Sequence, residues 1–217
     1  MCGRTSGVDL EPAVIRPYRP DDLDDLYRVC LQTANNGGDA TDLFEDPRLP
    51  GHVYAAPYAL FEPSLAFVAE DPAGVGGYVV AALDSRAFEQ RLERDWWPAL
   101  RTSHPEPSPQ LAKDLPLQEQ RTLHNIHHPW RADPDLVERF PSHLHIDLLP
   151  RLQGRGLGRQ LIAALATALR GQGSPGVHLH VGHSNQRAAG FYHHVGFTEL
   201  PATGVHIFAM DLKDLPE

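Results

Sequence analysis

A glycine-rich hexapeptide at residues 153–158, Gln-Gly-Arg-Gly-Leu-Gly, limits the architecture of this chain more than any other segment. Residues 143–149, just before it, alternate like a β-strand, and the leucines after it recur at the spacing of one helix face. Glycine lets a backbone turn tightly and approach a ligand, and the free N–H groups at a helix start attract anions. The segment therefore predicts a strand, a turn and a helix that hold a phosphate or pyrophosphate, with Arg155 and Arg159 adding positive charge.

Three phosphate-binding patterns can be compared with this hexapeptide. A Walker P-loop requires Gly-Lys followed by Ser or Thr, which the sequence lacks. A Rossmann fingerprint requires G-x-G-x-x-G in an early βαβ unit, whereas the three glycines here alternate and occur late in the chain. The third pattern, Gln/Arg-x-x-Gly-x-Gly/Ala, is matched position for position by Gln153, Gly156 and Gly158. On these six residues alone, a glycine turn without a ligand stays open as the alternative.

The third pattern is the acyl-CoA motif of the GNAT superfamily of N-acetyltransferases, and a second block of the chain resembles that family as well. The 27 positions from Gly158 to Asn185 leave room for one helix and one strand, as in the family. The second block has the spacing of the family's next strand–helix segment and consists of Asn185, Ala188, Phe191, Tyr192, Gly196 and Phe197. The resemblance implies an α/β (α+β) fold with a mixed, twisted sheet of about seven strands flanked by helices.

The length of 217 residues suits one domain. We expect this GNAT domain over residues 13–217, after a flexible tail at 1–12. Residues 103–141 hold seven prolines and few apolar residues, which predicts an irregular insertion with one short helix. Three further local predictions concern helix ends, namely that Ser85 and Ser184 cap helices and that Pro98 ends one.

Composition excludes several classes of protein. A formal net charge of −9 argues against direct nucleic-acid binding, and no apolar run approaches the roughly 20 residues needed to cross a bilayer. Because residues 1–12 contain no apolar signal core, we expect a cytoplasmic protein without a membrane partner. The two cysteines, Cys2 and Cys30, cannot form a disulfide framework, and Cys30 lies on an apolar helical stripe, where we expect a buried small hydrophobe.

The family resemblance implies acetyl-CoA as the acyl donor. In the family pattern the strand end pairs with the pantetheine arm, the glycine turn holds the pyrophosphate, the asparagine contacts CoA and the tyrosine lies near its sulfur. The CoA-binding residues that the resemblance implies are Leu148, Leu149, Gln153, Gly154, Arg155, Gly156, Leu157, Gly158, Arg159, Asn185 and Tyr192.

Acetyl transfer to an amine needs a base, a proton donor for the leaving thiolate and an N–H for the developing oxyanion. The resemblance implies that Tyr192 donates a proton to the leaving thiolate. It also implies that the N–H of Leu149, or of a neighbour, donates a hydrogen bond to the developing oxyanion. His143, His145 and Asp147 alternate on one strand and therefore share a face. Asp147, nearest the cofactor end, is the candidate base, and His145 could orient or relay. The alternative is an exposed or mutually hydrogen-bonded stripe.

The remaining candidates shape or surround the acceptor site. His178 and His180 on the next strand could add to the polar surface but are more often structural. His124, His127 and His128 lack accompanying cysteines or nearby acids, so no metal is expected. We expect regions 35–58 and 103–141 to control acceptor access. Residues that could line the acceptor pocket are Asp39, Tyr54, Tyr58, Trp96 and Trp97.

A narrower resemblance bears on catalytic competence. Residues 15–20, 37–41, 51–58 and 145–147 are similar to bacterial acetyltransferases related to the acetyltransferase-like C-terminal domain of animal O-GlcNAcases, which is regarded as a pseudo-enzyme. The expected function is acetyl-CoA-dependent N-acetylation of a primary amine on a small molecule or peptide. A non-catalytic acetyl-CoA-binding or interaction module is the alternative, and the acyl length and a homodimer stay open.

Overall fold

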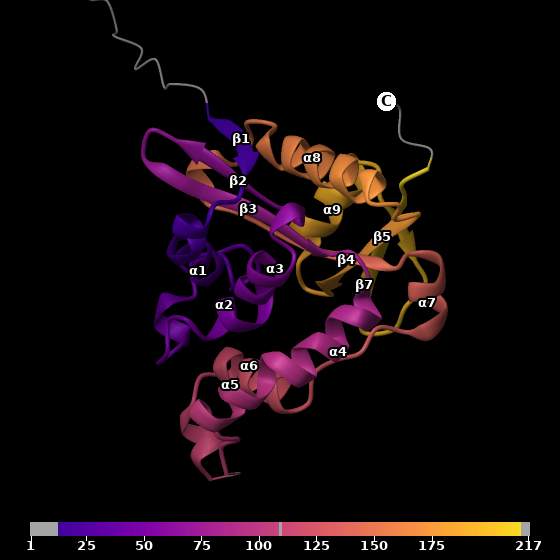
Figure 1. The fold of residues 1–217 in the computed structure, drawn as a ribbon. Helices are drawn as coiled ribbons and strands as arrows, with labels where there is room; N and C mark the ends of the chain where they lie inside the picture. The colour runs from indigo at the N-terminus through magenta and orange to yellow at the C-terminus, as the bar shows by residue number, and fades with distance from the viewer. Residues whose placement is uncertain (1–12, 109, 214–217) are drawn as a thin grey trace, which may run out of the picture.

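The computed structural model describes residues 13–108 and 110–213, in which one seven-stranded sheet has helices on both faces (Figure 1). The sheet order is β1-β2-β3-β4-β5-β7-β6, and every neighbouring pair is antiparallel except β4 and β5. This mixed sheet confirms the predicted fold class, while the expected tail at 1–12 lies outside the described residues. The strands are β1 Val14–Pro17, β2 Ala66–Asp71, β3 Gly74–Ala82, β4 Ser142–Leu148, β5 Gly176–Gly182, β6 Thr198–Leu200 and β7 Val205–Asp211.

Helices form two layers because the central strands bury both of their faces. Along β3, Tyr78 and Val80 point into one apolar cluster, and Val79 and Ala81 point into the other. Helices α8 and α9 cover one face, and α1 to α3 cover the other, with α4 to α6 extending that layer (Figure 1). The helices are α1 Leu23–Leu31, α2 Leu49–Tyr54, α3 Ala56–Phe61, α4 Ser85–Asp95, α5 Trp97–Ser103, α6 Leu117–His127, α7 Pro134–Arg139, α8 Leu157–Gly171 and α9 Gln186–His194.

Strands β4 and β5 part after a short stretch of parallel pairing. Their register contains two pairs, Ser142 with Val177 and His143 with His178, although both strands continue for several more residues. The backbone groups of β4 that face β5 beyond His143 therefore lose their strand partner. The space between the two diverging strands is called the wedge. Because backbone N–H and C=O groups require hydrogen-bond partners, those of β4 that face the wedge can bind an extended polar ligand.

The prediction of an irregular segment with one short helix at 103–141 was wrong, because the segment contains α6, α7 and a 3-10 turn at Leu111–Asp114. Two of its prolines lie where helices tolerate them. Pro116 immediately precedes α6, and Pro134 occupies the first turn of α7, where a missing N–H costs nothing. The side chain of Asp133 caps α7 by accepting from two backbone N–H groups.

The three predictions on helix ends were also wrong. Asp84, not Ser85, caps α4 by accepting from the N–H of Ala87, and Asn185, not Ser184, caps α9. Pro98 does not end a helix but lies in the first turn of α5. The buried position predicted for Cys30 is confirmed. Within the described residues, no helix has both the length and the apolar character to span a membrane.

The observed caps can be tested by a matched pair of substitutions. Asp84→Ala should lower the free energy of unfolding by about 1 kcal/mol, since it removes an N-cap bond from α4, whereas Ser184→Ala should be nearly neutral. Urea unfolding followed by circular dichroism measures both. Equal losses in the two variants would contradict the assignment of the caps.

Candidate active site

The polar stripe on β4 divides into two environments on the face covered by α1 to α6. His143 and His145 lie against Tyr58 of α3, with ring centroids 5.4 and 5.0 Å from the tyrosine ring. Asp147 lies against Tyr78 of β3, whose hydroxyl donates to its Oδ2 at 2.6 Å. The expected shared face is therefore present, but the stripe serves two different sets of partners.

A hydrogen-bond chain fixes which ring nitrogens of the two histidines carry protons. The Ser85 hydroxyl donates to the Pro141 carbonyl at 2.7 Å, so it must accept from Nδ1 of His143, also at 2.7 Å. Nε2 of a neutral His143 then accepts from the Tyr58 hydroxyl at 2.9 Å, and the Tyr58 oxygen accepts from Nε2 of His145 at 3.1 Å. This order leaves a lone pair on Nδ1 of His145, to which no group of the described residues is bonded.

Burial keeps this group of imidazoles neutral. It lowers the pKa of His145 and of His180 to about 4, and it holds the pKa of His143 well below its usual range, in each case aided by neighbouring histidines. Burial also lowers the pKa of His178, against the carbonyl of Phe140, which accepts from its Nδ1 at 2.7 Å. At neutral pH the rings are therefore acceptors and donors of hydrogen bonds rather than cations.

Asp147 and Tyr192 are two further buried acidic groups of the site, and the charge of the first influences the second. Burial raises the pKa of Asp147, although the hydrogen bond from the Tyr78 hydroxyl opposes the shift. Burial also raises the pKa of Tyr192 on α9, and the negative charge of Asp147 raises it further. No group of the described residues is hydrogen-bonded to the Tyr192 hydroxyl, which stays protonated over the whole physiological range.

A cavity of about 460 Å³ lies where β4 and β5 part. His145 lines it, whereas Asp147 does not. Of the residues expected at the acceptor pocket, Asp39 and Trp96 are not among those that line this cavity. The lining residues are Val53, Tyr54, Tyr58, Phe88, Glu89, Leu92, Glu93, Trp97, Asn125, Pro129, Trp130, Arg131, Ala132, His143, Leu144, His145, His178, Leu179, His180 and Val205.

The alternation on β4 was informative, but its counterpart on β5 was undervalued. His178 and His180 were expected to be structural, and both line the cavity. Their Nε2 atoms are buried and have no partner among the described residues, and His178 is 1% exposed. The signal that could have found them is the same period-two spacing on the strand paired with β4, where His178 stands in register with His143.

The glycine turn has the conformation that its sequence predicts. Gly154 and Gly156 have φ values of +70° and +75°, which favour glycine, and Gly156 is the residue before α8. Gly158 serves packing instead, because a Cβ there would lie 3.0 Å from the ring of Phe191 on α9. Arg155 and Arg159 are exposed beside the turn, and neither forms an ion pair with the described residues.

The end of β4 corrects one expected donor. The N–H of Leu149 donates to the carbonyl of Gly76 on the β3 side at 2.8 Å, so it is not free. Since alternate backbone groups of a strand point to opposite neighbours, the N–H of Leu148 faces the wedge. The Leu148 carbonyl accepts from Nε2 of Gln153 at 2.7 Å, and Arg187 on α9 donates to Oε1 of Gln153. Gln153 thereby ties the strand end to the turn and to α9.

The histidines near residue 124 lie apart from this site, on the surface. Nε2 of His128 lies 2.8 Å from Oε1 of Glu106, and the potential ligand atoms of Glu106, His124 and His128 are all within 4.8 Å of one another. His127 instead contacts the carbonyl of His104 through its Nε2 at 2.8 Å. The sequence did not indicate this acid, because a chain turn brings it from another segment.

The neutral histidines predict an acid-sensitive fold. Their pKa values are lower in the folded state than in the unfolded chain, so below pH 6.5 the unfolded chain takes up protons that the folded protein does not. Stability should fall between pH 6.5 and 4, by up to about 3 kcal/mol each for His145 and His180. Urea unfolding from pH 7 to 4.5 measures this, and His180→Phe should flatten the curve. A stability unchanged between pH 7 and 5 would contradict the burial of neutral rings.

Comparisons with known proteins agree with the geometry of the site. The family model for the acetyltransferase (GNAT) family matches residues 41–197. Protein O-GlcNAcase of Rattus norvegicus is 24% identical over 188 residues, which are 86% of this chain and 20% of that relative, so the chain spans about a fifth of its length. Mycothiol acetyltransferase of Beutenbergia cavernae is 33% identical over 157 residues, covering 59% of this chain and 52% of that protein.

Solved structures show the same fold. The crystal structure of SsHAT superposes with a TM-score of 0.83 at 36% identity, covering 92% of this chain and 98% of that chain. The structure of yncA from Salmonella typhimurium, solved with its cofactor acetyl-CoA, has a TM-score of 0.53 at 14% identity, covering 94% of this chain and 96% of that chain. The chain belongs to the acetyltransferase (GNAT) family.

Proposed function

We propose that the protein is an acetyl-CoA-dependent N-acetyltransferase that acts on a primary amine. The observation that carries the proposal is the meeting of the β4–β5 wedge with a cavity in which His145 offers a free lone pair. One side of this junction suits a thioester donor and the other side suits an amine, so both reactants of an acetyl transfer have a place.

The residues around the wedge fit acetyl-CoA, which supplies an activated acetyl thioester when bound. The N-terminus of the 15-residue helix α8 and the left-handed Gly154 and Gly156 present backbone N–H groups for the pyrophosphate, beside the exposed Arg155 and Arg159, which form no ion pair within the described residues. In this proposal the remaining contacts are those expected of Leu148, Leu149, Gln153, Leu157, Gly158, Asn185 and Tyr192. The N–H of Leu148 takes the oxyanion role first expected of Leu149.

His145 is the base in this proposal. An amine nucleophile must lose a proton, and Nδ1 of His145 is the proposed acceptor, because His145 lines the cavity and this nitrogen has no hydrogen-bond partner among the described residues. The bonds through Tyr58 to His143 hold the ring in the tautomer that keeps this lone pair available. Asp147, the base expected from the sequence, is hydrogen-bonded to Tyr78 and does not line the cavity.

Tyr192 is the proton donor to the leaving sulfur. Its raised pKa keeps the hydroxyl protonated, and the charge of Asp147 contributes to that shift. In the transfer, the amine nitrogen bonds to the acetyl carbon and the carbon–sulfur bond breaks. His145 takes the proton of the amine, and Tyr192 gives its proton to the sulfur. Before the next turnover His145 releases its proton to water and Tyr192 takes one up from water, so the protons balance. The role of Asp147 is then to keep Tyr192 protonated between turnovers.

Calorimetry with acetyl-CoA tests donor binding. Wild-type protein should bind with micromolar affinity, and Gly156→Glu should weaken binding at least tenfold, because it places a carboxylate at the anion site and strains a positive φ. Gly171→Glu at the opposite end of α8 is the control, because a Cβ added there would have no neighbouring atom within 4 Å. This variant should bind acetyl-CoA as the wild-type protein does. Absence of binding in folded wild-type protein would refute the proposal.

Kinetics of the variants test the assigned roles. His145→Gln should lower kcat by at least a hundredfold and Tyr192→Phe by at least tenfold. Asp147→Asn should lower kcat by a smaller factor than either of these variants. Because a base works in its neutral form, the acid limb of kcat should fall near pH 4 rather than 6.5. Full activity of His145→Gln with loss in Asp147→Asn would make Asp147 the base. Binding of acetyl-CoA without turnover on any amine would indicate an interaction module instead.

A further inference from the structure

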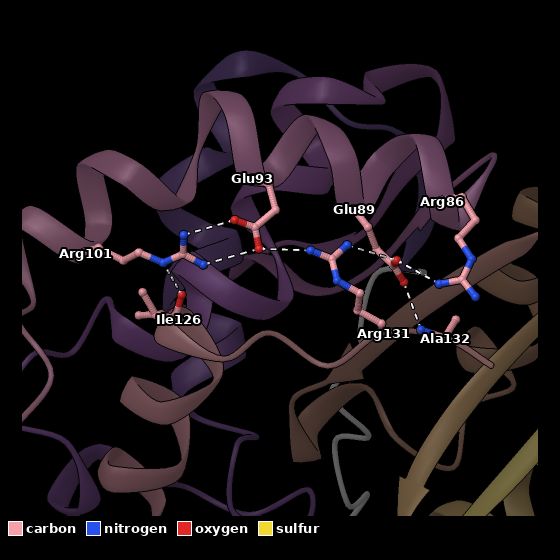
Figure 2. Close-up of polar contacts among 7 residues, drawn as sticks. All are labelled: Arg86, Glu89, Glu93, Arg101, Ile126, Arg131 and Ala132. Atoms are coloured by element: carbon pink, nitrogen blue, oxygen red, sulfur yellow. Dashed lines mark hydrogen bonds and ion pairs between the residues drawn. The ribbon is translucent and has the colours of Figure 1, made fainter. Parts of the chain in front are cut away.

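One wall of the cavity is a strap, residues 129–132, that connects α6 to α7 and is held to α4 by a ladder of charges. Figure 2 shows Arg131 reaching between Glu89 and Glu93, at 3.6 and 3.2 Å, and the N–H of Ala132 donating to Oε1 of Glu89 at 2.9 Å. Arg86 and Arg101 bind the outer sides of the two glutamates at 3.2 and 3.0 Å (Figure 2). The strap is therefore a fixed wall.

The ladder also decides which charges the cavity offers. Glu89, Glu93 and Arg131 are the charged residues among those that line it, and all three are already paired with one another. The four lining histidines are neutral at physiological pH. Among the described residues, the cavity thus offers no unpaired cation to a carboxylate or phosphate, and acceptors that carry such a group are disfavoured.

Five aromatic residues, Tyr54, Tyr58, Phe88, Trp97 and Trp130, also line the cavity. Tyr58 stacks on Phe88 with centroids 4.5 Å apart, and Trp130 of the strap meets His180 edge-on at 4.2 Å. Tyr54 and Trp97 complete this aromatic lining. A volume of about 460 Å³ is that of a small-molecule site, and flat walls of this kind suit a flat apolar body.

Two lone pairs in this aromatic cavity have no donor. Nδ1 of His178 donates to the Phe140 carbonyl, so its buried Nε2 is an acceptor, and neither this atom nor the buried Nε2 of His180 has a partner in the described part of the chain. A buried polar group without a partner lowers stability, and a ligand hydroxyl or N–H that binds it would recover that loss. Both residues lie on β5, across the wedge from His145 on β4.

We infer that the acceptor is an arylalkylamine whose ring carries a hydroxyl or N–H donor. Its amine meets Nδ1 of His145, its ring lies between the aromatic walls, and its donor reaches His178 and His180. This inference rests on the proposed acetyl transfer and names the substrate class of that same site.

The test compares two amines that differ in one hydroxyl group. Release of CoA thiol is measured with tyramine, phenethylamine, tyrosine, spermidine and a lysine-containing peptide. The value of kcat/KM for tyramine should exceed that for phenethylamine at least tenfold, since the latter leaves the imidazole lone pairs unpaired. It should exceed the values for tyrosine, spermidine and the peptide by at least as much.

Variants connect this preference to the cavity. His180→Phe should reduce the ratio of the tyramine and phenethylamine kcat/KM values to below three, because the phenyl ring has no lone pair. His194→Phe, an exposed histidine of α9 outside the cavity, is the matched control and should keep the wild-type ratio. A wild-type ratio near one, or a ratio unaffected by His180→Phe, would overturn the inference.

Other outcomes separate the inference from the proposed function. Acetylation of spermidine or of the peptide in preference to tyramine overturns the inference and leaves the acetyltransferase function in place. If the protein binds acetyl-CoA in calorimetry but acetylates none of the five compounds, both the proposed function and the inference are overturned.

Discussion

The parallel pairing of β4 and β5 ends after two residue pairs, and the site depends on where it ends. Up to that point the strands are hydrogen-bonded, and His143 is paired with His178. Beyond it, alternate backbone groups of β4 face the open wedge, and one of them, the Leu148 carbonyl, accepts a hydrogen bond from Gln153. A longer ladder would close the wedge, whereas a shorter one would release the two strands that carry the cavity's histidines.

The cavity is lined by groups that lower the stability of the fold but are available to bind a ligand. Neutral, buried imidazoles keep lone pairs that water would otherwise share, and Nε2 of His178 and of His180 are buried without a partner among the described residues. The hydroxyls of Tyr58 and Ser85 bind both ring nitrogens of His143 and Nε2 of His145, and in doing so they select the tautomer of His145. Stability lost in this way is typical of active sites, where polar groups are arranged for a ligand rather than for the folded chain alone.

Sequence patterns predicted the parts of the fold that local chemistry determines. The glycines at 154 and 156 require positive φ, and the period-two stripe at 143–147 requires one face, so both could be recognised without a structure. What could not be predicted depends on contacts distant in sequence. Which N–H is free at the end of β4 depends on the register of β4 with β3, and the position of His178 at the cavity depends on its register with His143. Prolines concealed α6 and α7 because a proline before a helix resembles one that breaks it.

The two halves of the site have different origins in the chain. The wedge, the turn and α9 come from residues 142–197, where the spacing of a few glycines and an asparagine already defines a donor site. The walls opposite come from residues 53–132, where the sequence offered only the family similarity of 51–58 and where 103–132 was expected to be irregular. These walls are nonetheless ordered by specific contacts, since Ile126 is fully buried and its carbonyl accepts from Arg101 at 2.8 Å. Donor binding is therefore encoded locally, whereas acceptor choice is encoded in how α4, α6 and the strap pack together.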